Sequence, residues 1–373
     1  MPTLINRLAD TRPAPPLALL PGQSRGRGAR SNVSGRFEAT ARLIFDDGWE
    51  TLGEAPESHA TSVTTETVRS IITHNQSPDI SFDRSINPYR GCEHGCTYCY
   101  ARPSHSYMGL SAGLDFESKL FAKANAAEVL RAELSKKGYI PRTIALGVNT
   151  DAYQPIEKRL EITRSILKVL AEFNHPVGII TKSALVLRDL DILKPMAEKG
   201  LVKVAVSVTT LDPKLSRSME PRAAAPHKRL QTLEVLSKAG IPTVAMLAPV
   251  IPALNDHEIE AILNAVSAAG VKQAGYVLLR LPLELDDIFR QWLLTDHPGK
   301  AAHVLSLIRS MRAGKTNDAS FGTRMTGTGP YAWTLGRRFE IACRKLGINT
   351  HKVKLDETRF TRPPQPGEQL TLL

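Results

Sequence analysis

Three cysteines lie within eight residues of one another and are the part of the sequence best suited to chemistry. Cys92, Cys96 and Cys99 stand in a C-x3-C-x2-C arrangement within NPYRGCEHGCTYCYAR. Thiolates at this spacing can converge from one loop on the irons of a [4Fe-4S] cluster. A cubane has four irons, so three cysteines leave one iron open to the amino and carboxylate groups of S-adenosylmethionine (SAM). The spacing therefore predicts a cluster that binds this cofactor.

Two other uses of these cysteines have weaker support. A structural zinc site would need His94 or His105 as its fourth ligand, but such sites usually draw on two separated ligand pairs, and the sequence offers no second pair. A ferredoxin-like electron carrier would need a fourth local cysteine, usually followed by proline, and residues 101–103 (ARP) contain none. From another class of function, a redox-sensing cluster or a nucleic-acid-binding protein that never cleaves SAM stays open.

The elements that must position the cysteines follow an alternating pattern. Short β-branched runs alternate with longer amphipathic stretches, which is typical of βα units and a parallel sheet. The expected strands are residues 80–83, 143–148, 177–181, 202–208, 243–250 and 275–279. Expected helices include one that ends at Gly138, one from Pro226 to a stop at Gly240, and one capped by Asn255 that ends at Gly270. Six such units predict an α/β fold, a partial (β/α)6 TIM-like barrel with its chemistry at the carboxyl ends of the strands.

The rest of the chain suggests extensions around this core. Residues 1–34 are rich in proline, glycine and arginine and predict a flexible basic arm, with a transit peptide as the weaker alternative. Residues 35–80 form a pre-core segment and residues 81–282 the catalytic core. Helical periodicity over residues 283–350 predicts a C-terminal helical cap, and residues 351–373 have the proline content of a tail.

The cluster motif also carries a family resemblance. With Tyr98 as its aromatic residue, C-x3-C-x-aromatic-C resembles the signature of the radical SAM superfamily, and the resemblance covers roughly residues 81–282. Further runs that resemble a bacterial group compared with spore photoproduct lyase and "DNA repair photolyase" proteins are GRFE, NPYRGC, YCYARPSH, TDAYQPIE, VSVTTLDP, EPRAA and APVIPALND. The resemblance implies reductive cleavage of SAM to a 5′-deoxyadenosyl radical, with electrons from a flavodoxin or ferredoxin.

One departure from that group concerns a further cysteine. Spore photoproduct lyase uses a cysteine downstream of its cluster as hydrogen-atom donor, whereas here no cysteine lies between Cys99 and Cys343. Cys343 falls in an amphipathic stretch, FEIACRKLGI, which favours a buried inert thiol. Thymine-dimer repair by that route is therefore not expected.

Candidate cofactor contacts follow the expected strands. The resemblance implies that Asn149, Thr150 and Asp151 meet the methionyl amine of SAM, although capping of the next helix is the alternative. Hydroxyl-rich strand ends add Lys182 and Ser207 as ribose-side contacts, with a turn hydroxyl as the alternative for Ser207. The cluster-flanking Tyr98 completes the expected cofactor site.

Two arginines and the basic charge concern the substrate. Arg217 and Arg222 are candidates to bind an anionic substrate or the SAM carboxylate, unless they only form surface ion pairs with Glu220. The formal net charge of +11 favours nucleic acid as a partner. No apolar run is long enough to span a membrane, and the cysteine usage favours a reducing cytoplasm.

The last residues resemble a docking peptide. Gln369, Leu370, Leu372 and Leu373 match the short Q-L-x-L-[FL] peptide with which bacterial replication and repair proteins bind the DNA sliding clamp. An extended, proline-led terminus can present spaced leucines to an apolar pocket at low cost in ordering. The alternative is that these leucines pack on their own chain.

Overall fold

Six parallel strands in chain order form the framework of the molecule. The computed structural model describes residues 26–38 and 60–363. Within them a seven-stranded sheet has the order β10-β9-β8-β7-β6-β3-β2, and only β2 is antiparallel to its neighbour. The strands are β2 (Thr73–His74), β3 (Arg84–Ile86), β6 (Ile144–Leu146), β7 (Val177–Thr181), β8 (Val202–Ser207), β9 (Thr243–Val250) and β10 (Gln273–Leu278). The sequence correctly predicted this mixed α/β fold with a parallel sheet.

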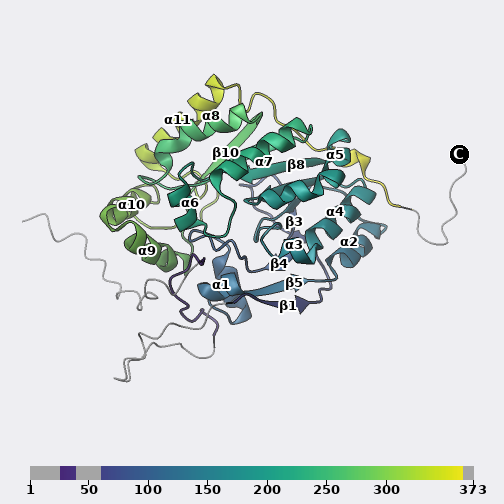
Figure 1. Ribbon diagram of the computed structural model, residues 1–373, viewed down its shortest axis with the longest axis horizontal. Coiled ribbons are helices and arrows are strands. Elements are labelled where there is room, and N and C mark those ends of the chain that lie inside the picture. The colour runs from purple at the N-terminus through teal and green to yellow at the C-terminus, as the bar shows by residue number, and fades with distance from the viewer. Residues whose placement is uncertain (1–25, 39–59, 364–373) are drawn as a thin grey trace, which may run out of the picture.

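Helices cover one face of this sheet, as Figure 1 shows. Val177, Ile179, Val204 and Val206 alternate along β7 and β8 and are at most 1% exposed, because they pack against the helices on this face. The helices between strands are α2 (Ala126–Ser135), α3 (Glu157–Leu160), α4 (Ile162–Glu172), α5 (Leu190–Glu198), α6 (Pro213–Met219), α7 (Pro226–Lys238) and α8 (Ile259–Ala268), with the short 3-10 helices η3 (Ala184–Asp189) and η4 (Asp256–Glu258).

Two local predictions were wrong. The first strand is β3 and begins at Arg84, not at residue 80, because Ile86 is the apolar side chain that reaches the core and is fully buried. Asn255 does not cap its helix. Its side-chain amide instead donates to the Thr209 and Pro249 carbonyls, at 2.7 and 3.0 Å, and so ties the ends of β8 and β9 together.

A small second sheet precedes the loop that contains the cysteines. Its order is β1-β5-β4, formed by β1 (Ser62–Glu66), β4 (Tyr89–Arg90) and β5 (Lys119–Lys123). In Figure 1 these strands lie at the lower edge of the molecule beside α1 (Leu114–Ser118). The cysteine loop leaves β4 directly and continues into the 3-10 helix η2 (Arg102–Met108).

Residues 26–34 differ from the expected flexible arm. Ala29 is fully buried, and the Arg27 guanidinium donates to the Glu117 carbonyl at 2.7 Å. Gly28 and Ala29 donate backbone N–H groups to the Glu117 carboxylate at 2.9 and 2.7 Å. These contacts hold the segment against α1, because a buried carboxylate supplies the partners that its backbone needs. The remainder of the expected arm, residues 1–25, lies outside the described residues.

Three long helices fall within the segment expected to form a cap. They are α9 (Leu285–Asp296), α10 (Pro298–Ser310) and α11 (Gly329–Lys345). Most of the buried apolar residues of α9 and α10, Trp292 among them, share one apolar cluster with Cys96 and Tyr98. Helices α9 and α10 therefore pack directly on the cysteine loop. Beyond it, η5 (Glu357–Arg359) and Phe360 return to the core side, where Phe360 packs on Tyr139 and Phe173.

The segment between α10 and α11 connects the two edges of the large sheet. Leu278 of β10 donates its N–H to the Met325 carbonyl at 2.9 Å. Gly322 donates its N–H to Asp79, in the loop between β2 and β3, at 2.7 Å, and the Arg324 side chain contacts the same carboxylate at 2.5 Å. One segment thus joins the last strand at one edge to the β2–β3 loop at the other. In the described part of the chain no helix is long and apolar enough to cross a membrane.

Candidate active site

The three cysteines lie on one loop, between β4 and η2, at the carboxyl end of the parallel strands. Cys92 and Cys96 are each 6% exposed and Cys99 is partly buried, and none of them is in a disulfide. Gly91 and Gly95 have φ values of +75° and +65°, a conformation that L side chains rarely adopt. A side chain on Gly91 would also meet the Phe116 carbonyl at 2.8 Å. The two glycines therefore allow the loop to fold tightly around its thiols.

Burial sets the chemistry of these thiols. It raises the pKa of both Cys92 and Cys96, and the neighbouring Asp151 raises that of Cys92 further. Metal binding releases the protons of its thiol ligands, so a bound metal would keep these sulfur atoms ionised despite the raised pKa. The donor set, three free sulfur atoms on one loop that belong to two apolar clusters, fits a [4Fe-4S] cluster with one iron left for another ligand.

The zinc alternative is not supported by the histidines. The His94 ring lies 3.3 Å from Asp151, and His105 is hydrogen bonded to the Lys119 carbonyl at 2.9 Å.

A buried ion pair supports one side of the cysteine loop. Arg102 and Glu117 are both fully buried and contact each other directly. Arg102 also donates from Nε to the Cys96 carbonyl at 2.8 Å and from Nη1 to the Ala112 and Gly113 carbonyls at 3.1 and 3.0 Å. The sequence analysis missed Glu117, because nothing in the sequence distinguishes it from the neighbouring Asp115, which is also buried.

A second buried ion pair supports the other side. Glu220 accepts hydrogen bonds from Tyr98, from Arg229 and, at 2.9 Å, from Thr209. Arg229 in turn donates to the Ser207 carbonyl at 3.1 Å. The alternative of a surface ion pair between Glu220 and Arg217 or Arg222 is therefore wrong, because Glu220 is buried and pairs with Arg229 of α7.

The two arginines expected at the substrate lie apart. Arg222 forms an ion pair at 3.0 Å with Glu93, which belongs to the cysteine loop, and donates its N–H to the His94 carbonyl at 3.4 Å. Arg217 is exposed on α6 and makes no ion pair in the described part of the chain. The structure therefore brings Arg222 to the cysteine loop and leaves Arg217 on the surface.

The three residues expected to bind SAM after the second strand, Asn149, Thr150 and Asp151, make hydrogen bonds within the protein. Asn149 and Thr150 donate their N–H groups to the Asn87 side chain at 2.8 and 3.3 Å, which fixes the turn after β6. Asp151 accepts from Thr181 Oγ1 and from the Lys182 N–H, both at 2.7 Å. Burial alone would raise the pKa of Asp151, but the nearby His94 ring and these hydrogen bonds outweigh it and hold the pKa at about 2.

Lys182 and Ser207 lie on the sheet face opposite to the helices. Alternate residues of a strand lie on the same face of the sheet. Lys182 therefore shares a face with Gly178 and Ile180, and Ser207 shares that face with Lys203 and Ala205. The Lys182 ammonium lies 5.7 Å from the centre of the Tyr98 ring. Tyr98 lies between Cys96 and Cys99 in the sequence, so the sheet face that carries Lys182 and Ser207 lies next to the cysteine loop.

Gln154 is a further residue that sequence reasoning missed. It is fully buried, donates to the Gly91 carbonyl at 3.1 Å and accepts from the Glu93 N–H at 2.8 Å. It therefore fixes the backbone on both sides of Cys92. Its position three residues after Asp151, within the run TDAYQPIE, was the available signal.

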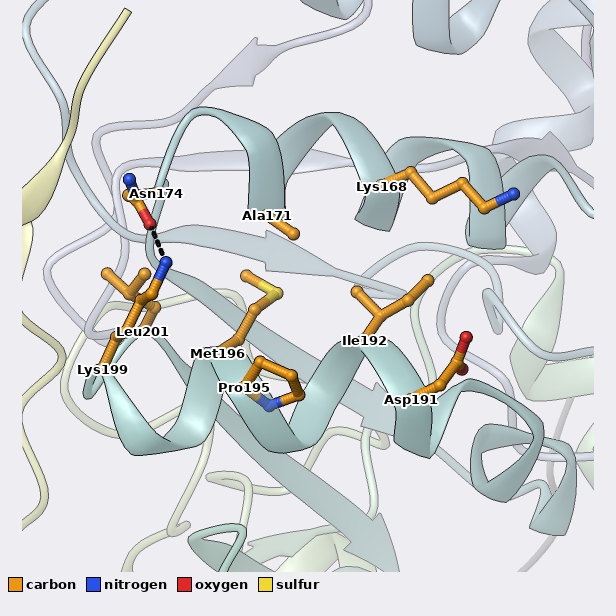
Figure 2. Close-up of a pocket in the computed structure, with 9 residues that line it drawn as sticks. All are labelled: Lys168, Ala171, Asn174, Asp191, Ile192, Pro195, Met196, Lys199 and Leu201. Atoms are coloured by element: carbon orange, nitrogen blue, oxygen red, sulfur yellow. Dashed lines mark hydrogen bonds between the residues drawn. The ribbon is translucent and has the colours of Figure 1, made fainter. Parts of the chain in front are cut away.

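A separate surface pocket lies at the opposite end of the strands. Figure 2 shows its lining by residues of α4 and α5. Asn174 and Leu201 on its wall precede β7 and β8, so the pocket opens near the amino ends of these strands. It is therefore distinct from the cysteine site.

Comparison with known proteins agrees with this geometry. The radical SAM superfamily profile matches residues 86–266. An uncharacterized Mycobacterium tuberculosis protein is 36% identical over 232 residues, which is 62% of this chain and 68% of that protein. An uncharacterized Methanocaldococcus jannaschii protein is 33% identical over 173 residues, 46% of this chain and 62% of that one. Solved structures of spore photoproduct lyase share the fold, with a TM-score of 0.55 and 14% identity over 77% of this chain and 80% of theirs.

The chain belongs to the radical SAM superfamily. It is an enzyme whose cofactors are a [4Fe-4S] cluster and SAM, as the cysteine spacing predicted. When bound, these cofactors supply the reductive cleavage of SAM that yields a 5′-deoxyadenosyl radical.

Replacing any one of Cys92, Cys96 or Cys99 by alanine should abolish SAM cleavage, because each is expected to supply one thiolate to the cluster. Anaerobically reconstituted wild-type protein should carry about four irons per chain. Cys343→Ala is the matched control, since Cys343 is buried on α11, outside the cysteine loop. Iron analysis and the absorbance of the cluster measure the outcome, and loss of the cluster in Cys343→Ala would contradict the three-ligand site.

Gly28→Ala should lower iron loading severalfold. A Cβ at this position would lie 1.7 Å from the Gly95 carbonyl oxygen, so the new methyl group must displace the cysteine loop or the N-terminal segment. Gly138→Ala is the control, because a Cβ there meets nothing within 4 Å. Iron per chain and the thermal midpoint of the anaerobic proteins should be compared. Equal loading in both variants would show that residues 26–31 do not constrain the cluster.

Proposed function

We propose that this radical SAM enzyme acts on nucleic acid. The observation that carries the proposal is the shared fold with spore photoproduct lyase, whose solved complexes contain SAM and a dinucleoside photoproduct. The formal net charge of +11 supports the same substrate class, because phosphate neutralisation dominates the binding of nucleic acid. Modification or repair of a base is the reaction class that both features favour.

The finer architecture proposed for the core is a partial (β/α)6 barrel. The six parallel strands follow chain order from β3 to β10, as successive right-handed βα units would place them. Support also comes from residues 322–325, which contact both β10 and the β2–β3 loop, since a sheet whose edges are bridged by one short segment must curve strongly. The concave face would then be the one with Lys182 and Ser207.

Within this barrel, Tyr98, Asn149, Lys182 and Ser207 are the proposed SAM contacts. Their support is their position around the cysteine loop and on the face that looks onto it. Thr150 and Asp151 are proposed to position them, because Thr150 bonds to the Tyr89 carbonyl at 3.0 Å and Asp151 already accepts from Thr181 and Lys182. Arg222 is proposed to hold the cysteine loop through Glu93, and Arg217 is left as a substrate contact from the surface.

The reaction also needs an electron donor and a reducing environment. A flavodoxin or ferredoxin remains the proposed donor, and the cytoplasm the proposed compartment, since four free cysteines persist most readily where thiols stay reduced. The chain's own contribution is to hold the cofactors, exclude water from the buried cysteine loop and present the substrate.

Anaerobic incubation with dithionite and SAM should release 5′-deoxyadenosine, and a short DNA duplex should bind with an affinity that falls steeply as salt rises. Chromatography of the nucleoside and fluorescence anisotropy of a labelled duplex measure the two parts. Release of the nucleoside without any binding of DNA or RNA would reject the nucleic-acid substrate. The alternative of a cluster-based redox sensor predicts that no 5′-deoxyadenosine is released.

The last residues are proposed to bind a DNA sliding clamp. Gln369, Leu370, Leu372 and Leu373 lie outside the described residues, so this proposal rests on their sequence. A labelled peptide covering residues 361–373 should bind purified bacterial clamp with a Kd of roughly tens of micromolar, typical of a weak but specific peptide contact. Gln369→Ala and Leu372→Ala peptides should bind less tightly by anisotropy. A peptide with no affinity in this range would disprove the tether.

A further inference from the structure

Arg280 occupies a position at the mouth of the proposed barrel that no role described above explains. It lies two residues beyond the end of β10, and the preceding Leu279 donates its N–H to the Val250 carbonyl at the end of β9 at 3.0 Å. It is also close enough to Tyr100 for the two side chains to interact electrostatically. Tyr100 directly follows Cys99, and its hydroxyl donates to the Val148 carbonyl just after β6. Arg280 therefore lies at the same rim as the cysteine loop.

The hydrogen bonds of Arg280 are unusually few for a partly buried arginine. Its Nη1 contacts the Met325 sulfur at 3.7 Å, and a thioether is a weak acceptor. Its Nε is buried and has no hydrogen-bond partner, and in the described part of the chain no carboxylate lies within ion-pair distance. A desolvated guanidinium without an acceptor is costly, so such a group calls for a partner.

The other buried arginines of the core are paired far better. Arg102 has the Glu117 carboxylate and three carbonyls, and Arg229 has Glu220. Arg312 is 1% exposed and donates to the carbonyls of Thr323, Arg324, Leu278 and Leu279. Arg312 Nε also lacks a partner, but Arg280 differs from these three arginines because in the described part of the chain it makes no hydrogen bond to a carbonyl or a carboxylate.

The charges around Arg280 favour an anion. Arg312 and Arg324 are its cationic neighbours, and Asp79 and Asp318 are the carboxylates that act on it from a distance. Asp79 already accepts from the Arg324 Nε at 2.5 Å and from the Gly322 N–H at 2.7 Å. Burial lowers the pKa of Arg280, and the neighbouring Arg324 lowers it further. The three guanidinium groups therefore have only two carboxylates near them, and both oxygens of Asp79 already accept hydrogen bonds. This excess of positive charge favours an anion.

We propose that Arg280 binds a backbone phosphate of a nucleic-acid substrate at the entrance to the site. The two terminal nitrogens of the guanidinium, Nη1 and Nη2, present N–H groups that match two non-bridging phosphate oxygens, and neither belongs to the buried atoms without a partner. A phosphate held here places the adjoining nucleoside on the side of the cysteine loop. This assignment rests on the proposed nucleic-acid substrate and names the residue that positions it. The contact is with the phosphate backbone of the nucleic acid and not with a base, so it does not depend on the nucleotide sequence.

The test compares Arg280→Gln and Arg280→Lys with Arg337→Gln, all as anaerobic holoproteins. Arg337 is a surface residue of α11 paired with Glu340, so its replacement removes the same charge away from the rim. Binding of a labelled DNA duplex is measured over a salt series, and SAM affinity is measured by calorimetry on the same samples. Iron content and circular dichroism verify that each variant is folded.

Arg280→Gln should weaken duplex binding about tenfold and lower the slope of log K against log salt by about one, as the loss of one phosphate contact requires. The duplex affinity of Arg280→Lys should lie between those of the wild type and Arg280→Gln, because lysine keeps the positive charge but lacks the paired N–H groups of a guanidinium. SAM affinity should be unchanged in both.

If the wild type binds the duplex and Arg280→Gln matches Arg337→Gln, the assignment is wrong while the proposed substrate stands. A loss of SAM affinity with normal duplex binding would assign Arg280 to the cofactor carboxylate and overturn it as well. A wild type that bound no nucleic acid would instead remove the proposed function itself.

Discussion

The buried ion pair between Arg102 and Glu117 is the interaction on which the cysteine loop most depends. Arg102 fixes the Cys96 carbonyl and the two carbonyls before α1, while Glu117 fixes the backbone of Gly28 and Ala29. Both groups are fully buried, so neither charge has water to replace a lost partner. Removal of one member of such a pair costs about 3–5 kcal/mol. The pair therefore links three segments, residues 27–29, the cysteine loop and α1, into one unit.

A similar arrangement on the other side of the loop gives the site its rigidity. Glu220 binds the Tyr98 hydroxyl from the cysteine loop and Arg229 from α7, and Arg229 reaches the Ser207 carbonyl at the end of β8. The loop is thus joined to the parallel sheet by charged groups and to the cap by the apolar cluster around Trp292. Buried charges whose hydrogen bonds are all made specify one geometry, which a cluster with three fixed ligands requires.

The sequence predicted best those features that depend on local pattern. The five strands from β6 to β10 follow β-branched runs, and α7 begins at Pro226 as predicted. The cysteine spacing was sufficient for the cofactors, because ligand number alone sets the open iron. The partners of Glu117 and Gln154 were beyond reach, since Gly28 lies 89 positions from Glu117 and Glu93 lies 61 positions from Gln154. No local periodicity encodes such contacts, and for the same reason a Pro/Gly/Arg-rich composition concealed the packing of residues 26–34.

The positions of the thiols limit how a substrate radical can be quenched. Three of the four cysteines form the cysteine loop, and Cys343 is buried on α11, where its sulfur accepts a weak contact from Asn349 at 3.9 Å. Burial also raises the pKa of Cys343 to about 11, which makes it a poor exchange partner. α11 packs against α8 on the helix-covered side, whereas Lys182 and Ser207 lie on the opposite face of the sheet. Cys343 is therefore buried away from the face that carries Lys182 and Ser207, and the other three cysteines of the chain all lie in the cysteine loop.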